Sequence, residues 1–137
     1  MNRADLRKIA TIRLQEAKTL QQSRKYSGAY YLAGYSIECG FKACIAKSFG
    51  RFEFPDKKKV DSSYTHNLRE LAKIAGLEPD REQRSLADTR FLNNWTIVVR
   101  WSEASRYRVY GRLESKGLLD AIIERDHGIM PWIVKNW

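Results

Sequence analysis

One stretch in the first half of the chain constrains the fold more than any other. Residues 27–49 read SGAYYLAGYSIECGFKACIAKSF, with no proline and only three charged side chains, Glu38, Lys42 and Lys47. Apolar and small residues would lie on every side of a helix formed by this stretch, and a helix that is apolar all round is buried. At 1.5 Å per residue it would span roughly 35 Å. We therefore expect a central helix around which the other helices pack.

Small residues recur along this predicted helix. Gly34 and Gly40 lie in its interior, where each glycine costs about 1 kcal/mol relative to alanine. Together they extend a surface of small side chains that also includes Ala29, Ala33, Ser36 and Ala43. Such a surface lets neighbouring helices approach closely. The sequence leaves open whether those neighbours belong to the same chain or to a second subunit.

Two opposite charges lie one turn apart on the same helix. Glu38 and Lys42 can pair at this spacing, but a pair in a buried helix is costly unless it has further partners. Each charge would cost about 2.5–3.5 kcal/mol at a bilayer centre, so we do not expect a membrane span. Arg13 lies within the apolar stripe of a first helix predicted over residues 1–25. It either reaches the surface along its aliphatic stem or pairs with Glu38.

The rest of the chain predicts an all-α domain over residues 1–137, the length of one domain. Apolar periodicity predicts a short helix that follows Thr65 and is ended by Gly76, and longer helices at 81–100 and 113–126. Thr65 is the expected N-cap of the first of these, and Asp80 with Gln83 resembles a capping box. Residues 50–63, with three consecutive lysines, are expected to form a loop. A restart at Gly128 and Pro131 leads to a tail with two tryptophans, which should dock on the core or on a second subunit.

Charge is the strongest compositional signal. The chain carries a net charge of +9, and its isoelectric point is about 9.7. These values favour a polyanionic partner such as nucleic acid, with an acidic protein as the alternative. Cys39 and Cys44 lie on one helix with side chains pointing apart, which is typical of a reduced cytoplasmic protein. The N-terminus has no apolar run or lipidation signal, so we expect neither export nor anchoring.

Residues 101–112, WSEASRYRVYGR, mix three arginines with aromatic residues. Arginine interleaved with aromatic side chains suits RNA or nucleotide bases through stacking and phosphate contact. Arg108, Tyr110 and Arg112 have no evident inward role and are predicted to contact phosphates or bases. Trp101 and Tyr107 are interpreted as core anchors at a helix junction, with Arg106 pairing with Glu38 or Glu103.

The chain shows no phosphate-binding glycine loop, no dinucleotide motif and no zinc-ligand spacing, so we expect no metal and no cofactor. His66 is expected to pack or cap locally. His127, close to Arg125, is the candidate general base.

Several motifs resemble bacterial HEPN-domain proteins, a family of small all-α domains. GAYYLAGYSIECGFKACIAK at 28–47 is similar to their second helix, and the similarity continues through IRLQEAKTL, THNLRELAKIAGL, WSEASRY and HGIMPW. The resemblance implies an up-and-down bundle of four to five helices, commonly a homodimer. It also implies RNA or nucleotide as a ligand and a minimal nucleotidyltransferase as a partner, in a toxin–antitoxin or defence pair.

Many HEPN domains are metal-independent ribonucleases with an arginine and a histidine that are separated by four to six intervening residues. This chain lacks that motif: residues 59–61 before His66 are Lys-Val-Asp, and residues 120–122 before His127 are Asp-Ala-Ile. The histidine-X-tyrosine target of partner nucleotidyltransferases is also absent.

Two main functions therefore remain, and a third possibility is an interaction protein whose basic surface holds an acidic partner protein. The first is a non-catalytic module that binds RNA, a nucleotide or a nucleotidyltransferase, with an inward polar cluster of Arg13, Glu38, Lys42 and Arg106. The alternative is a divergent metal-independent ribonuclease that uses His127 with Arg125.

Overall fold

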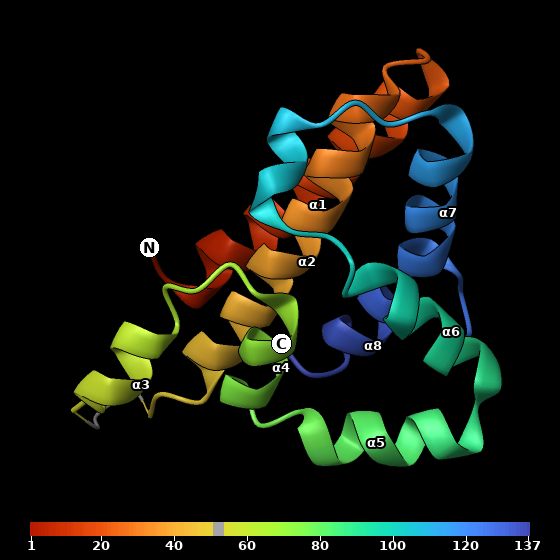
Figure 1. The fold of residues 1–137 in the computed structure, drawn as a ribbon. Coiled ribbons are helices and arrows are strands. Elements are labelled where there is room, and N and C mark those ends of the chain that lie inside the picture. The colour runs from red at the N-terminus through yellow and green to blue at the C-terminus, as the bar shows by residue number, and fades with distance from the viewer. Residues whose placement is uncertain (51–53) are drawn as a thin grey trace.

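The computed structural model describes residues 1–50 and 54–137, and these residues form eight α-helices and one 3₁₀ helix with no β-strand among them (Figure 1). The predicted all-α helical bundle is thus confirmed. Four of these nine described helices have seven residues or fewer. The elements are α1 (Arg3–Gln22), α2 (Tyr26–Lys47), α3 (Lys57–Ser62), α4 (Leu68–Ile74), α5 (Glu78–Ala87), α6 (Thr89–Val98), η1 (Glu103–Tyr107), α7 (Arg112–Ile123) and α8 (Ile129–Val134).

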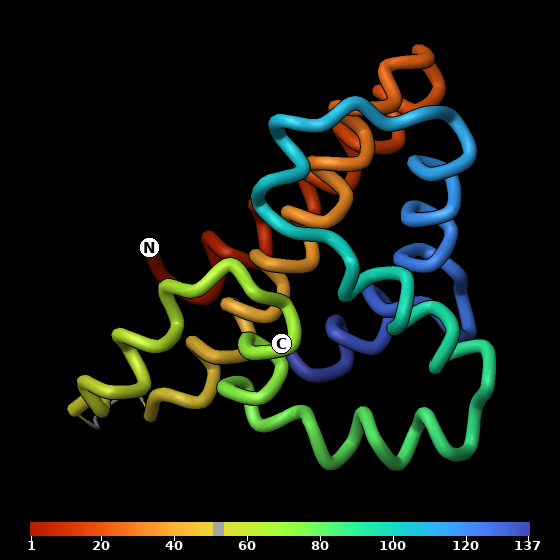
Figure 2. The backbone as a smooth tube through the Cα atoms, viewed as in Figure 1, coloured from red at the N-terminus to blue at the C-terminus, as the bar shows by residue number. Residues whose placement is uncertain are grey.

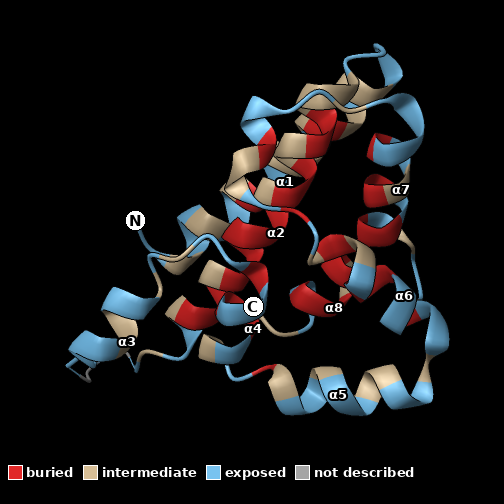
Figure 3. Cartoon of the chain, viewed as in Figure 1, coloured by how far each residue is buried: buried red, intermediate tan, exposed pale blue. Residues whose placement is uncertain are grey.

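Helix α2 is the centre of the molecule, as its all-round apolar sequence predicts. It pairs with α1 as an antiparallel hairpin and also contacts α4, η1, α7 and α8. Figure 3 shows the buried residues gathered on α2 and on the faces of α6, α7 and α8 that turn toward it. None of the described helices combines the length and apolarity needed to cross a lipid bilayer.

The small-residue surface of α2 meets other parts of the same chain. A Cβ added at Gly34 would lie 2.2 Å from indole carbons of Trp101, and one added at Gly40 would lie 3.0 Å from Ile133. Real Cβ atoms essentially never lie 2.2 Å from another heavy atom, so the glycine at position 34 is what lets the indole rest on the helix backbone. The close approach predicted from the glycines is confirmed, and it is intramolecular.

The C-terminal tail docks on the core, as predicted. Trp132 on α8 is 2% exposed, and its ring makes edge contacts with Phe41, Phe91 and Trp95. Its indole nitrogen donates a hydrogen bond of 2.6 Å to Asp80. Asp80 is therefore not part of a capping box with Gln83, because α5 already begins at Glu78.

The helix expected over residues 81–100 is broken at Asp88. This residue has extended backbone angles (φ −140°, ψ 98°), and its side chain accepts a hydrogen bond of 3.1 Å from the Phe91 amide. Aspartate competes for backbone N–H groups and so favours N-caps over helix interiors. The expectation of one helix with Asp88 on its inner face was wrong, because α5 ends there and α6 begins.

Other helix boundaries also differ from the predicted ones, because the cap residues at each end decide where a helix begins or stops. Asp56 caps α3 inside the segment expected to be a loop, of which residues 51–53 lie outside the described residues. Asn67, rather than Thr65, caps α4. The helix expected to end at 126 ends at Ile123, and Gly128 begins α8.

The chain between η1 and α7 runs over the α1–α2 turn (Figure 2). The Tyr110 amide donates to Ser27 Oγ over 2.9 Å, and Gln21 Nε2 donates to the Arg112 carbonyl over 3.4 Å. We call residues 106–113 the arginine strap. These two hydrogen bonds fasten the strap to the hairpin of α1 and α2.

Candidate functional site

Glu38 is a buried carboxylate at the middle of α2. It is 2% exposed, and its Oε1 accepts a hydrogen bond of 2.9 Å from Lys42 Nζ. The same oxygen lies 2.9 Å from Nδ1 of His66, on the segment that leads into α4. The structure therefore contains the predicted Glu38–Lys42 pair, and it adds His66 as the further partner that a buried pair needs.

His66 bridges two carboxylates. Its Nδ1 faces Glu38, while its Nε2 lies 3.2 Å from Oε2 of Glu103 at the start of η1. The contact to Glu38 is a hydrogen bond, and the contact to Glu103 is within ion-pair distance. The ring is about half exposed, with 46% of the side chain accessible.

A pocket of about 380 Å³ opens beside His66. It is lined by residues 65–69, at the start of α4 and just before it, and by residues 99–103, which lead from the end of α6 to the first residue of η1. Arg69 and Arg100 both line it, both are exposed, and neither has an ion-pair partner among the described residues. Glu103 is the one carboxylate in the described lining. The pocket therefore holds more positive than negative charge.

Two buried polar atoms at this site lack partners. Oε2 of Glu38 and Nε1 of Trp101 make no hydrogen bond with any described residue. Trp101 lines the pocket, and Glu38 binds the histidine that lines it. Buried polar groups are almost always hydrogen-bonded, and ordered water is a common partner for such exceptions; Arg3 Nε and Trp95 Nε1 are further exceptions among the described residues.

Arg13 and Arg106 do not join Glu38. Arg13 pairs with Glu16 at 2.9 Å on its own helix and remains 37% exposed, which is the surface alternative foreseen for it. Arg106 is exposed and lies over the ring of Tyr107, with its guanidinium carbon 4.9 Å from the ring centroid. Of the predicted cluster of Arg13, Glu38, Lys42 and Arg106, the structure therefore brings together only Glu38 and Lys42, and it adds His66 and Glu103.

The arginine strap departs from prediction at its two tyrosines. Tyr110 turns inward and stacks on Tyr30, with 3.7 Å between the ring centroids. Burial, with Tyr110 beside it, raises the pKa of Tyr30 to about 12. Tyr107, expected as a core anchor, is 80% exposed, whereas Trp101 is buried as expected. Arg108 and Arg112 are exposed on the strap, free to meet a ligand.

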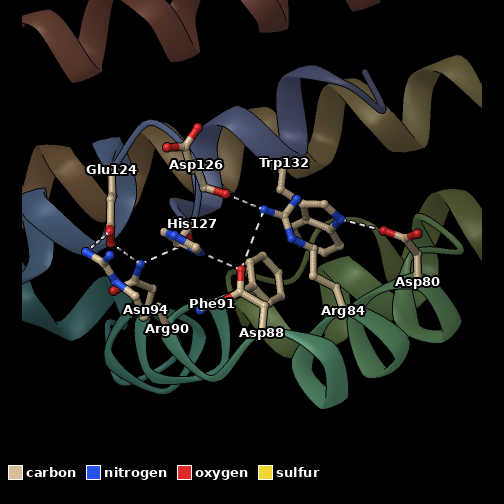
Figure 4. A network of polar contacts seen from close by, with 10 residues as sticks. All are labelled: Asp80, Arg84, Asp88, Arg90, Phe91, Asn94, Glu124, Asp126, His127 and Trp132. Atoms are coloured by element: carbon tan, nitrogen blue, oxygen red, sulfur yellow. Dashed lines mark hydrogen bonds and ion pairs between the residues drawn. The ribbon is translucent and has the colours of Figure 1, made fainter.

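A second polar network surrounds His127 (Figure 4). Nδ1 of His127 lies 2.6 Å from Oδ2 of Asp88, and this hydrogen bond lowers the pKa of the Asp88 carboxyl. Asn94 donates to the His127 carbonyl over 2.9 Å and to Glu124 over 2.8 Å. None of the described contacts joins Arg125 to His127. The network fixes the imidazole but does not supply the predicted arginine.

His66 is the candidate site residue that the sequence interpretation missed. The available signal was the buried Glu38–Lys42 pair, which required another partner, but that partner was sought on the apolar stripe of α1. His66 lies outside any helix, next to the Asn67 cap, so helical periodicity could not place it facing α2.

Comparison with known proteins finds no matching family model, no matching curated protein and no matching solved structure. The resemblance to HEPN-domain proteins thus rests on the sequence motifs alone.

Proposed function

We propose that this chain is a non-catalytic, HEPN-like module that binds single-stranded RNA or a nucleotide through the pocket beside His66. The observation that carries the proposal is that Arg69 and Arg100 line the same pocket as His66 without ion-pair partners among the described residues. Arginine binds phosphate oxygens through its planar fork of donors. Two arginines beside a histidine form a phosphate-binding arrangement.

Size and polarity of the pocket support the same ligand class. About 380 Å³ falls in the range of small-molecule sites. The side chains of His66, Arg69 and Arg100 in its lining offer donors to phosphate oxygens. The net charge of +9 favours the same polyanionic ligands.

The resemblance extends this proposal to the cellular setting. It suggests a homodimer in the cytoplasm, paired with a minimal nucleotidyltransferase in a toxin–antitoxin or defence gene pair.

A binding titration tests the pocket. Fluorescence anisotropy of a labelled 12-nucleotide RNA is measured for the wild type and for the double variant Arg69→Ala/Arg100→Ala. Losing two phosphate contacts should lower the slope of log affinity against log salt by about 1.4. The matched control is Lys8→Ala/Lys135→Ala, which removes two exposed charges elsewhere. Equal losses of affinity in both double variants would overturn the pocket as the binding site.

A metal-independent ribonuclease centred on His127 is the second candidate. The observation in its favour is the 2.6 Å contact from Nδ1 of His127 to Asp88, while Nε2 makes none of the described hydrogen bonds. A carboxylate that orients one ring nitrogen leaves the other to act as general base on a ribose hydroxyl. Arg125, exposed and two residues earlier, would be the phosphate ligand.

This candidate is tested by RNA cleavage in the presence of a metal chelator. Cleavage that disappears in His127→Ala, and falls in Arg125→Ala, would establish the ribonuclease. Absence of cleavage by the wild type, with RNA binding intact, would leave the binding module.

A further inference from the structure

We infer that Tyr107, with Arg106 beside it, is a stacking platform for one unpaired base of a single-stranded RNA. This inference rests on the proposed function, because it assigns the base that adjoins a phosphate bound in the pocket beside His66. It narrows the ligand from RNA in general to a strand with unpaired bases.

The first observation is an exposed apolar surface on a strongly basic segment. Tyr107 is 80% exposed, Val109 is 92% exposed and Leu113 is 80% exposed. All three lie on the arginine strap, which Figure 3 shows as largely exposed. Single exposed apolar residues are ordinary, but these three fall within seven positions of a segment that also carries three arginines.

The fold imposes the exposure of Tyr107. Ser105, two residues earlier, is 2% exposed and so fixes η1 against the core. Tyr110, three residues later, is held by its stack on Tyr30 and by the hydrogen bond from its amide to Ser27. With both sides anchored, the Tyr107 ring is presented to solvent rather than folded inward. A binding surface that is already ordered loses less conformational entropy when a ligand docks.

The surroundings of the ring select a nucleic acid rather than an apolar partner. The Arg106 guanidinium lies 4.9 Å from the ring centroid. Arg108 and Arg112 follow on the strap, are exposed, and have no ion-pair partner among the described residues. Aromatic faces that bind bases, interleaved with arginines that bind phosphates, are the recurrent composition of single-strand binding sites.

The platform and the pocket are two ends of one short element. Glu103 begins η1, lines the pocket and contacts His66, and Tyr107 ends η1. Four steps of about 2.0 Å along a 3₁₀ helix span about 8 Å. One strand can therefore place a phosphate in the pocket and an adjacent base on Tyr107. A base inside a duplex is stacked and paired, and it would have to be extruded first.

The test uses a fluorescein-labelled 12-nucleotide oligoadenylate and a copy with 2-aminopurine, whose fluorescence falls when it stacks. Tyr107→Ala should weaken binding by at least about fivefold, since one base–aromatic stack contributes that much or more. Tyr107→Phe retains the ring and should bind within about twofold of the wild type and quench 2-aminopurine, unlike Tyr107→Ala. Phe54→Ala, which removes another fully exposed aromatic ring, is the control and should bind as the wild type does.

The outcomes separate this inference from the proposed function. If Tyr107→Ala binds like the wild type while Arg69→Ala/Arg100→Ala binds weakly, stacking is wrong and the pocket stands. If neither variant weakens binding, both are wrong. If Tyr107→Ala loses as much affinity for duplex RNA as for single-stranded RNA, stacking on an unpaired base is also wrong. If Tyr107→Ala binds RNA weakly while Arg69→Ala/Arg100→Ala binds like the wild type, the stacking platform stands and the pocket is wrong.

Discussion

His66 Nδ1 lies 2.9 Å from Oε1 of Glu38, and this contact joins the segment before α4 to the buried centre of α2. The two residues are 28 positions apart in sequence. Glu38 is almost fully buried and His66 is half exposed. The contact therefore connects the core of the bundle to the mouth of the pocket, and it positions the histidine there.

Removing Glu38 should destabilise the fold. Glu38→Ala leaves Lys42 and His66 without their shared carboxylate and creates a small cavity, for an expected loss of about 2–4 kcal/mol in the free energy of unfolding. Urea unfolding followed by circular dichroism measures this loss. Glu16→Ala removes a carboxylate whose partner, Arg13, is surface-exposed, and it should cost less than about 1 kcal/mol. Equal losses for both variants would contradict the central position of Glu38.

Neutralising Glu103 should strengthen RNA binding. Its Oε2 lies 3.2 Å from Nε2 of His66 in the pocket, so the carboxylate competes with a phosphate for that nitrogen and repels the phosphate charge. Glu103→Gln should raise affinity about two- to fivefold, the worth of one exposed ion pair. Glu82→Gln makes the same charge change at an exposed site on α5 and serves as the control in the anisotropy titration. A change in Glu103→Gln no larger than in Glu82→Gln would show that Glu103 does not compete.

Two glycine-to-alanine changes should act in opposite directions. Gly34→Ala places a Cβ 2.2 Å from the Trp101 indole, and overpacking of this kind costs about 1–3 kcal/mol or more. Gly117→Ala, inside α7, meets nothing within 4 Å and should stabilise the helix by up to about 1 kcal/mol. Thermal unfolding compares them directly. A neutral Gly34→Ala would mean that the indole does not rest on α2.

The Asp88–His127 contact should make the free energy of unfolding depend on pH. Its hydrogen bond lowers the pKa of Asp88 in the folded chain. A carboxyl whose folded pKa is lowered stabilises the fold fully above its unfolded pKa of about 3.9, and this stabilisation is lost as pH falls through the lower folded value. Asp88→Asn keeps a good N-cap for α6 but removes the charge.

Unfolding by urea at pH 6 and at pH 2.5 tests this dependence. The stability difference between the wild type and Asp88→Asn should shrink at the lower pH. Asp61→Asn, at an exposed position, is the control and should show a smaller change. A difference for Asp88→Asn that is the same at both pH values would contradict the assignment.

The central helix, its Glu38–Lys42 pair and the docked tryptophan tail could be predicted because each depends on composition and local spacing. The break at Asp88 could not, because apolar periodicity runs across it and only the cap geometry divides α5 from α6. The orientation of Tyr107 and Tyr110 could not be predicted from the sequence either. A 3₁₀ helix followed by an extended strap changes the period there, so which tyrosine faces inward depends on the anchors at Ser27 and Tyr30.

The most direct measurement exploits the presence of two histidines in the whole chain. Ring ¹⁵N–¹H correlation spectra are recorded as adenosine monophosphate is added, with His66→Gln used to assign the two sets of signals. Binding in the pocket predicts that the His66 signals shift with saturation while those of His127 stay in place. Shifts confined to His127 would contradict the pocket and favour the ribonuclease site, and the absence of any shift would contradict nucleotide binding at either histidine.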